Sequence, residues 1–255
     1  MIIDTHAHLN MKDFDHDIDE ILFRSRLTNI KQIIVIGMDK DSNLKALNLS
    51  QRYLNIHPTF GIHPSYVDDA DIESLKDILK IHRPVAIGEC GIDLYWKKSN
   101  LNLQKEFFLE QIELAITYDL PLVIHMRNSF DEIYNLLLPY KGLVRGVFHC
   151  FSSNLSDAKK VIDLGFYIGI NGPVTYPNNS DLVDIIKNID LKHIVVETDA
   201  PFLSPVPYRG KRNEPAFLTY VTEKIAEIKQ TTKHEVERMT TQNAIRLFNL
   251  GGQTI

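Results

Sequence analysis

The chain is poor in cysteine, in flexible segments and in long apolar runs. Its 255 residues contain two cysteines, Cys90 and Cys150, and no CxxC pair, which excludes a disulfide framework and fits a reducing compartment. With only 12 glycines and 11 prolines it lacks the composition of a linker or a disordered region. No apolar run approaches the roughly 18 residues of a membrane span, and no signal peptide is expected at the start. We therefore expect a globular, cytoplasmic protein without a membrane partner.

Positive charge is also in short supply. Lysine and arginine number 28 against 33 aspartates and glutamates, which gives a formal net charge of −5 at pH 7. A protein that binds nucleic acid through a broad basic face has the opposite balance. A polyanionic substrate would therefore have to be held by a local basic patch or by bound cations. The chain also has ten histidines, and their positions decide between these possibilities.

What the chain does contain is a regular alternation of short β-branched runs and longer amphipathic stretches. The runs cover residues 2–6, 32–36, 58–62, 85–89, 122–125, 146–149, 167–170 and 194–197. Eight such units in about 250 residues are typical of an α/β protein of the (β/α)8 TIM barrel type. A doubly wound open sheet is the alternative, but no glycine-rich nucleotide-binding loop supports it. No composition shift marks a boundary, so we predict a single barrel domain over residues 1–255.

Local signals mark where some of the helices begin. Ser129 and Glu132 have the spacing of a capping box, and Asn154 is placed to cap a helix that Gly165 would end. Asn213 is predicted to cap a further helix with Pro215 in its first turn. The N-terminus of that last helix would then help to hold an anion.

Metal-ligand residue types follow the predicted strands. They are His6 and His8 at the first strand, Glu89 at the fourth, His125 at the fifth, His149 at the sixth and Asp199 after the eighth. Active sites of such barrels lie at the C-terminal ends of the strands, so these side chains are expected to converge. Imidazoles and carboxylates together suit a divalent metal ion. The alternatives are buried histidines bonded to backbone, a rim ion pair for Glu89 and a turn position for Asp199.

The spacing suggests a role for each residue. Side chains alternate along a strand, so His6 and His8 face the same way and can bind one ion together. The two oxygens of Glu89 can bridge two ions, with His125 and His149 as ligands of the second. Asp199 can bind a metal through one oxygen and accept a proton from a metal-bound water through the other. Glu197 shares its face and is expected to support a ligand.

Other candidates would contact a substrate. His63 could donate a hydrogen bond to a phosphate, or be a turn histidine bonded to backbone. Arg209, Lys211 and Arg212 form the best local basic patch, where barrels often bind phosphate, or else a solvated loop. Tyr95 and Trp96 could stack on bases, or pack beneath their loop. Both cysteines are expected to be buried and turned away from the metals.

These motifs together resemble those of the TatD-type metal-dependent deoxyribonucleases, which belong to the amidohydrolase-like barrels. The shared motifs are DTHAHL at 4–9, GIHP at 61–64, GECGID at 88–93, VIH at 123–125, HCF at 149–151, ETDAPFL at 197–203 and RGKRNEP at 209–215. They keep the family's order and extend over nearly the whole chain.

The resemblance implies metal-dependent phosphodiester hydrolysis, removing nucleotides from the 3′ end of DNA with single strands preferred. By position, His6, His8, Glu89 and Asp199 would hold one cation, and Glu89, His125 and His149 the second. Glu89 and Asp199 are the predicted catalytic residues, and His63, Arg209, Tyr95 and Arg212 the predicted substrate contacts. The ions are expected to be Mg, Mn or Zn, and the chain a monomer or a homodimer.

Two alternatives for the function stay open at this stage. The same centre could hydrolyse a small phosphoester, a lactone, an amide or an ester on transfer RNA. A different class of protein would be a metal-stabilised barrel that binds a partner without catalysis. Chelation separates the two classes, because only an enzyme loses turnover with EDTA and regains it with added metal.

Overall fold

The structure is a computed structural model that describes residues 1–96 and 98–251. Eight parallel strands form one sheet in sequence order, so each strand pairs with the next along the chain. The strands are β1 (Ile2–Ala7), β2 (Ile30–Val35), β3 (Ile56–Phe60), β4 (Ala86–Asp93), β5 (Leu122–Arg127), β6 (Gly146–Phe148), β7 (Tyr167–Ile170) and β8 (Ile194–Val196).

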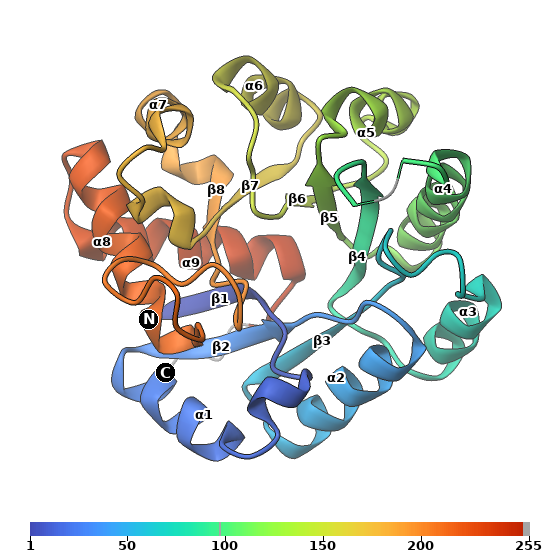
Figure 1. The fold of residues 1–255 in the computed structure, drawn as a ribbon, viewed down its shortest axis with the longest axis horizontal. Coiled ribbons are helices and arrows are strands. Elements are labelled where there is room, and N and C mark those ends of the chain that lie inside the picture. The colour runs from blue at the N-terminus through green and yellow to red at the C-terminus, as the bar shows by residue number, and fades with distance from the viewer. Residues whose placement is uncertain (97, 252–255) are drawn as a thin grey trace.

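Helices connect the strands and surround the sheet. They are α1 (Ile18–Leu27), α2 (Lys40–Arg52), α3 (Ile72–Ile81), α4 (Leu101–Tyr118), α5 (Phe130–Leu137), α6 (Leu155–Asp163), α7 (Ser180–Asn188), α8 (Leu218–Lys229) and α9 (Lys233–Phe248). Figure 1 shows the strands as a ring with α1 to α8 around it and α9 passing across it. The (β/α)8 TIM barrel predicted from the alternation is confirmed, and the doubly wound sheet is excluded.

The ring closes between its first and last strands. Ala7 bridges Ala200, the Asp199 amide donates to the carbonyl of His6 at 2.8 Å, and the His8 amide donates to Ala200 at 2.7 Å. Deeper in the barrel, the Thr5 hydroxyl donates to the Val196 carbonyl. These bonds bring segments from the two ends of the chain into direct contact at the mouth of the barrel.

Apolar side chains of β1, β2, β4, β5, β6 and β8 meet in one buried cluster. Only the interior of a barrel brings such distant strands together, so this cluster fills the lower part of the barrel. α9 contributes to the same cluster and therefore closes the N-terminal end of the strands. The members are Ile3, Ile34, Ile36, Ala86, Val123, Val147, Val195, Ala244, Leu247, Phe248 and Leu250. A second, larger cluster joins the outer faces of the strands to the helices around them.

Local sequence signals explain several helix ends. Asn154 caps α6 by accepting a hydrogen bond from the Asp157 amide, as predicted, and Gly165 follows the helix with φ of +91°. The capping box predicted at Ser129 is wrong, although α5 does begin after it. The Ser129 hydroxyl instead donates to the Ile92 carbonyl at 2.6 Å, because it is buried against the end of β4.

Candidate metal centre and active site

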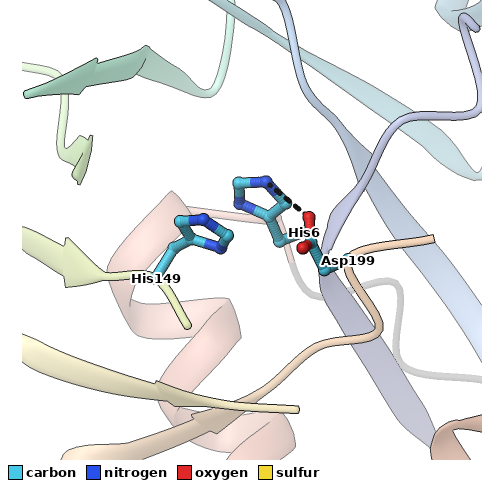
Figure 2. A group of neighbouring side chains, drawn as sticks. All are labelled: His6, His149 and Asp199. Atoms are coloured by element: carbon cyan, nitrogen blue, oxygen red, sulfur yellow. Dashed lines mark ion pairs between the residues drawn. The ribbon is translucent and has the colours of Figure 1, made fainter. Parts of the chain in front are cut away.

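All six predicted ligands lie together at the C-terminal ends of the strands. β1 carries His6 and is followed by His8, β4 carries Glu89 and β5 carries His125, while His149 and Asp199 follow β6 and β8. Their side chains are buried or half-buried. Figure 2 shows His6, His149 and Asp199 converging from three separate segments, with the His6 and His149 rings stacked 3.7 Å apart.

Four ligand atoms form a first group. The Nε2 atoms of His6 and His8 lie 3.2 Å apart, and each lies between 3.4 and 3.8 Å from both Glu89 Oε2 and Asp199 Oδ1. An ion about 2.1 Å from four tetrahedral ligands sets those ligands about 3.4 Å apart. The separations observed here are therefore those of a coordination shell.

The other oxygen of Glu89 faces a second group. Glu89 Oε1 lies 2.8 Å from His125 Nδ1, 3.2 Å from His149 Nε2 and 3.6 Å from His63 Nε2. The carboxylate of Glu89 is thus shared between two sets of imidazoles, one for each of its oxygens. The residues present fit a divalent metal, because buried lone pairs of nitrogen and oxygen converge from both sides of one carboxylate.

A buried carboxylate supports His149 from behind. Glu197 Oε1 lies 3.2 Å from His149 Nδ1 and accepts hydrogen bonds from the Cys150 amide at 2.6 Å and the Asn171 side chain at 3.3 Å. A proton held on Nδ1 leaves the lone pair of Nε2 directed at the centre. A Cβ atom at Gly169 would lie 2.5 Å from Glu197 Oε2, so glycine is required to seat this carboxylate.

Asp93 supports His125 in the same manner, and sequence reasoning missed it. Asp93 Oδ2 lies 2.9 Å from His125 Nε2. The predicted strand ended at Glu89, whereas β4 continues to Asp93. Period-two alternation over residues 89, 91 and 93 could have found the residue, because it places Asp93 on the face of Glu89.

Asp4 fixes the segment that carries Asp199. Its two oxygens accept hydrogen bonds from the Thr198 amide at 3.0 Å and the Thr198 hydroxyl at 2.6 Å. Burial raises the pKa of Asp4 to about 7 despite these bonds. The carboxylate of the first strand therefore holds the backbone next to the ligand that follows the eighth.

The charges of the centre are mutually supporting. Burial disfavours ionisation of Glu89, but the charge of His149 and its neighbouring imidazoles holds the Glu89 pKa well below its usual value. A hydrogen bond from His8 likewise outweighs burial and lowers the pKa of Asp199. Burial opposes protonation of His149, yet the negative charges of Glu89 and Glu197 raise its pKa well above the usual value. Both carboxylates are therefore ionised at neutral pH.

The centre forms the floor of an open pocket of about 570 Å³. This volume lies within the range of ~300–1,000 Å³ that is usual for ligand sites. Besides the ligands and their neighbours, the pocket is lined by Met38, Ser65, Tyr66, Trp96, Met126, Arg127, Cys150, Ser152, Phe202 and Leu203.

His63 stands beside the second group of ligands. Its Nδ1 accepts a hydrogen bond from the Ser65 amide at 3.1 Å, which leaves the ring hydrogen on Nε2. His63 Nε2 lines the pocket and is available as a donor. The backbone contact expected of a turn histidine and the exposure needed to contact a substrate are both present.

The predicted basic patch is only partly directed at a substrate. Arg212 is paired with Asp17, donates to the Asp13 carbonyl and lies over the Phe14 ring. The prediction that Arg212 contacts substrate is therefore wrong in this structure, because its donors tie the loop after β8 to the segment before α1. Arg209 instead lies over the Tyr176 ring at 4.5 Å and makes no ion pair with any described residue. Lys211 lies over Tyr208 at 5.9 Å.

Two further expectations are corrected. Asn213 does not cap a helix, because its buried side chain donates to the Thr198 and Phe202 carbonyls and the short 3-10 turn Pro215–Phe217 begins after Glu214. Cys90 is buried as expected, but Cys150 lies in the wall of the pocket.

The aromatic pair after β4 is exposed. The Tyr95 side chain is 54% exposed and the Trp96 side chain 71%, so neither packs beneath its loop. Trp96 lines the pocket, whereas Tyr95 does not.

A parallel barrel with imidazole and carboxylate ligands at the C-terminal ends of its strands defines the class of metal-dependent hydrolases with an amidohydrolase-like fold. The family model described as TatD related DNase matches residues 3–249, so the chain belongs to the TatD family. The resemblance seen in the sequence motifs is confirmed.

Relatives of the same length support this assignment. The metal-dependent hydrolase YabD of Bacillus subtilis is 37% identical over 254 residues, which cover 98% of this chain and 100% of YabD. The metal-dependent hydrolase YcfH of Escherichia coli K12 is 32% identical over 98% of this chain and 96% of its own. The crystal structure of YjjV, a TatD homologue from Escherichia coli K12, matches with a TM-score of 0.92 and 29% identity over 97% of this chain and 98% of YjjV.

The family settles the class of the protein. It is an enzyme that acts on ester bonds and depends on metal, so the alternative of a non-catalytic binding module is set aside. Among the described residues, no helix is long and apolar enough to cross a membrane.

Proposed function

We propose that this enzyme hydrolyses phosphodiester bonds of DNA and removes nucleotides from the 3′ end of single strands with the help of two divalent cations. The observation that carries the proposal is the division of Glu89, whose oxygens face separate ligand groups. Two cations on either side of a bridging carboxylate are a common arrangement for phosphodiester hydrolysis. The 3′ polarity and the preference for single strands follow from the family resemblance.

The charge of the pocket floor supports the need for cations. Glu89, Asp93 and Asp199 are three carboxylates where an anionic phosphate would have to bind. Without cations they would repel it, and with two divalent ions the sign of the local field is reversed. Imidazole and carboxylate ligands together accommodate Mg, Mn or Zn.

The shape of the pocket supports a strand end as the substrate. The ligand atoms are buried at the floor, so the scissile phosphate must enter a cavity of about 570 Å³. A duplex is much wider than this cavity, whereas the end of a flexible single strand can reach its floor.

The chain's own residues supply the remaining chemistry. When bound, the cations would neutralise the phosphate and activate a water molecule. Asp199, ionised and held by the Asp4–Thr198 contacts, accepts the proton of the attacking water. His63 donates its Nε2 hydrogen to a phosphate oxygen. Arg209, mounted on Tyr176 beyond the pocket, holds a phosphate further along the strand.

The test uses single- and double-stranded oligonucleotides labelled at either end. We expect metal-dependent release of nucleotides from the 3′ end of the single strand, abolished by EDTA and restored by Mn, Mg or Zn. A small phosphoester, a lactone, an amide and an aminoacyl transfer RNA are assayed in parallel. Turnover of one of these without cleavage of DNA would reject the proposed substrate and keep the metal-dependent chemistry.

Variants connect the activity to the site. His125→Ala should lower DNA hydrolysis by about 100-fold or more, because it removes a ligand of the second group. The exposed His234, which is remote from the ligand groups, provides a matched control as His234→Ala. Equal activity of the two variants would reject a catalytic role for the second group.

A further inference from the structure

The pocket has an exposed aromatic group that the metal centre does not explain. Trp96 lines the pocket with 71% of its side chain exposed. Leaving a large apolar ring in water gains nothing for folding, because its burial would be the stabilising step. The position is therefore more readily explained by a ligand than by packing.

A cation is stacked on the same aromatic pair. The guanidinium carbon of Arg127 lies 3.9 Å from the centre of the Tyr95 ring and 5.4 Å from that of Trp96. The two rings meet edge to face at 4.9 Å. Tyr95 thus supports the plane of the guanidinium from outside the pocket, and both Trp96 and Arg127 line it.

The donors of Arg127 are available. Within residues 1–96 and 98–251, the Arg127 guanidinium makes no ion pair and no hydrogen bond, in contrast to Arg212, which is paired with Asp17. Arg127 follows His125 by two residues on β5, about 6.6 Å along the strand. This step is comparable with the spacing of neighbouring phosphates in an extended single strand.

One carboxylate ties this group to the metal centre. Asp93 Oδ1 accepts hydrogen bonds from the Tyr95 amide at 2.8 Å and the Trp96 amide at 3.0 Å. Asp93 Oδ2 lies 2.9 Å from His125 Nε2. The turn that presents Trp96 is therefore fixed relative to a metal ligand rather than placed at random on the surface.

We propose that Trp96 and Arg127 form a nucleotide subsite beside the metal centre, in which a base of the substrate strand stacks on Trp96 and Arg127 binds the phosphate next to the scissile one. This inference rests on the proposed function and adds the requirement for a base at a defined position. Stacking on an aromatic ring tolerates any base, so the subsite selects nucleic acid over small phosphoesters without selecting a sequence. Guanidinium groups bind phosphate with paired hydrogen bonds.

The test compares an ordinary single-stranded oligonucleotide with the same strand lacking the bases of its three terminal nucleotides. Trp96→Leu should raise KM for the ordinary strand about tenfold, leave KM for the abasic strand unchanged and alter kcat by less than about threefold. Arg127→Gln should raise KM for both strands, because both keep the phosphate. Phe23→Leu, an exposed aromatic on α1, and Arg145→Gln, which precedes β6 at the other end of the barrel, are the matched controls.

Trp96 also reports binding directly. It is the only tryptophan in the chain, so the intrinsic tryptophan fluorescence comes from the subsite alone. The ordinary strand, made with phosphorothioate linkages to slow cleavage, should quench this fluorescence, and the abasic strand should not. Equal quenching by both strands, or an equal change of KM for both in Trp96→Leu, would overturn the subsite while leaving DNA hydrolysis intact. Failure of the wild-type enzyme to cleave either strand would overturn the proposed function and the subsite together.

Discussion

The two ends of the barrel are built from the same strands and do opposite work. At the N-terminal end, the interior holds Val123, Val147 and Val195, and α9 closes it with Leu247 and Phe248. Two residues further along β5, and just beyond β6 and β8, the same inward alternation gives His125, His149 and Glu197.

The difference shows how one backbone pattern serves stability and chemistry. An apolar plug is stabilised by removal from water, whereas a group of buried carboxylates and imidazoles is costly unless ions or hydrogen bonds compensate. Concentrating the second kind at one end lets the other end supply the free energy of folding. Changes at the mouth should therefore affect turnover, and changes at the closed end should affect unfolding.

The largest effect is expected from Glu89→Gln. Loss of the shared negative charge should lower turnover by about 1,000-fold or more, in keeping with the several kcal/mol that a metal centre contributes to a transition state. Added Mn²⁺ should raise the melting temperature of the wild type through preferential binding to the folded state and should raise that of the variant much less. Glu132→Gln, a partly exposed carboxylate paired with Lys105, is the control. Near-wild-type turnover in Glu89→Gln would exclude a bridging role.

Phe248→Ala should affect the opposite property. Truncating this buried ring of the α9 plug is expected to lower the free energy of unfolding by about 3–5 kcal/mol, as measured by urea denaturation. The kcat of the remaining folded enzyme should stay within about twofold. The fully exposed Leu54 gives a control, since Leu54→Ala should change stability by less than about 0.5 kcal/mol. A large fall in kcat in Phe248→Ala would remove the distinction between the two ends.

A moderate effect is expected from Glu197→Gln, which lies between the two regions. The variant keeps an acceptor for His149 and Cys150 but loses the charge that fixes the proton on His149 Nδ1. Metal affinity should fall about 10- to 100-fold, measured as the Mn²⁺ concentration that gives half-maximal activity. Most of the turnover should return at saturating Mn²⁺. An unchanged metal requirement would show that Glu197 serves packing alone.

The smallest effect is expected from Arg212→Gln. Its pair with Asp17 is partly exposed, so the loss of stability should be about 0–1 kcal/mol. KM for DNA should be unchanged, in contrast to the increase predicted for Arg127→Gln. A clear rise in KM for Arg212→Gln would return this residue to the substrate-binding set.

The sequence was sufficient for the parts that depend on strand period and strand order. Inward alternation at the ends of successive parallel strands brings His6, His125 and His149 together without knowledge of any side-chain conformation. The support of His149 by Glu197 follows from the same alternation. These features are properties of the backbone pattern, which the sequence displays directly.

What escaped prediction depends on competition between hydrogen-bond partners. Ser129 has the spacing of a capping residue, but the Ile92 carbonyl lies closer to its hydroxyl in the folded barrel. Arg212 belongs to a basic run, but Asp17 from the other end of the chain takes its donors. Asp93 was missed because β4 runs four residues beyond the predicted end. In each case the deciding partner is distant in sequence.

Closure of the ring has a consequence for the making of the protein. Asp4 and Thr198, which join the first strand to the segment after the last, are 194 residues apart, so this seam forms only when β8 has left the ribosome. Until then His6 and His8 have no Asp199 to complete their shell. A nascent or prematurely ended polypeptide therefore carries no finished centre, and hydrolytic activity begins only with a completed chain.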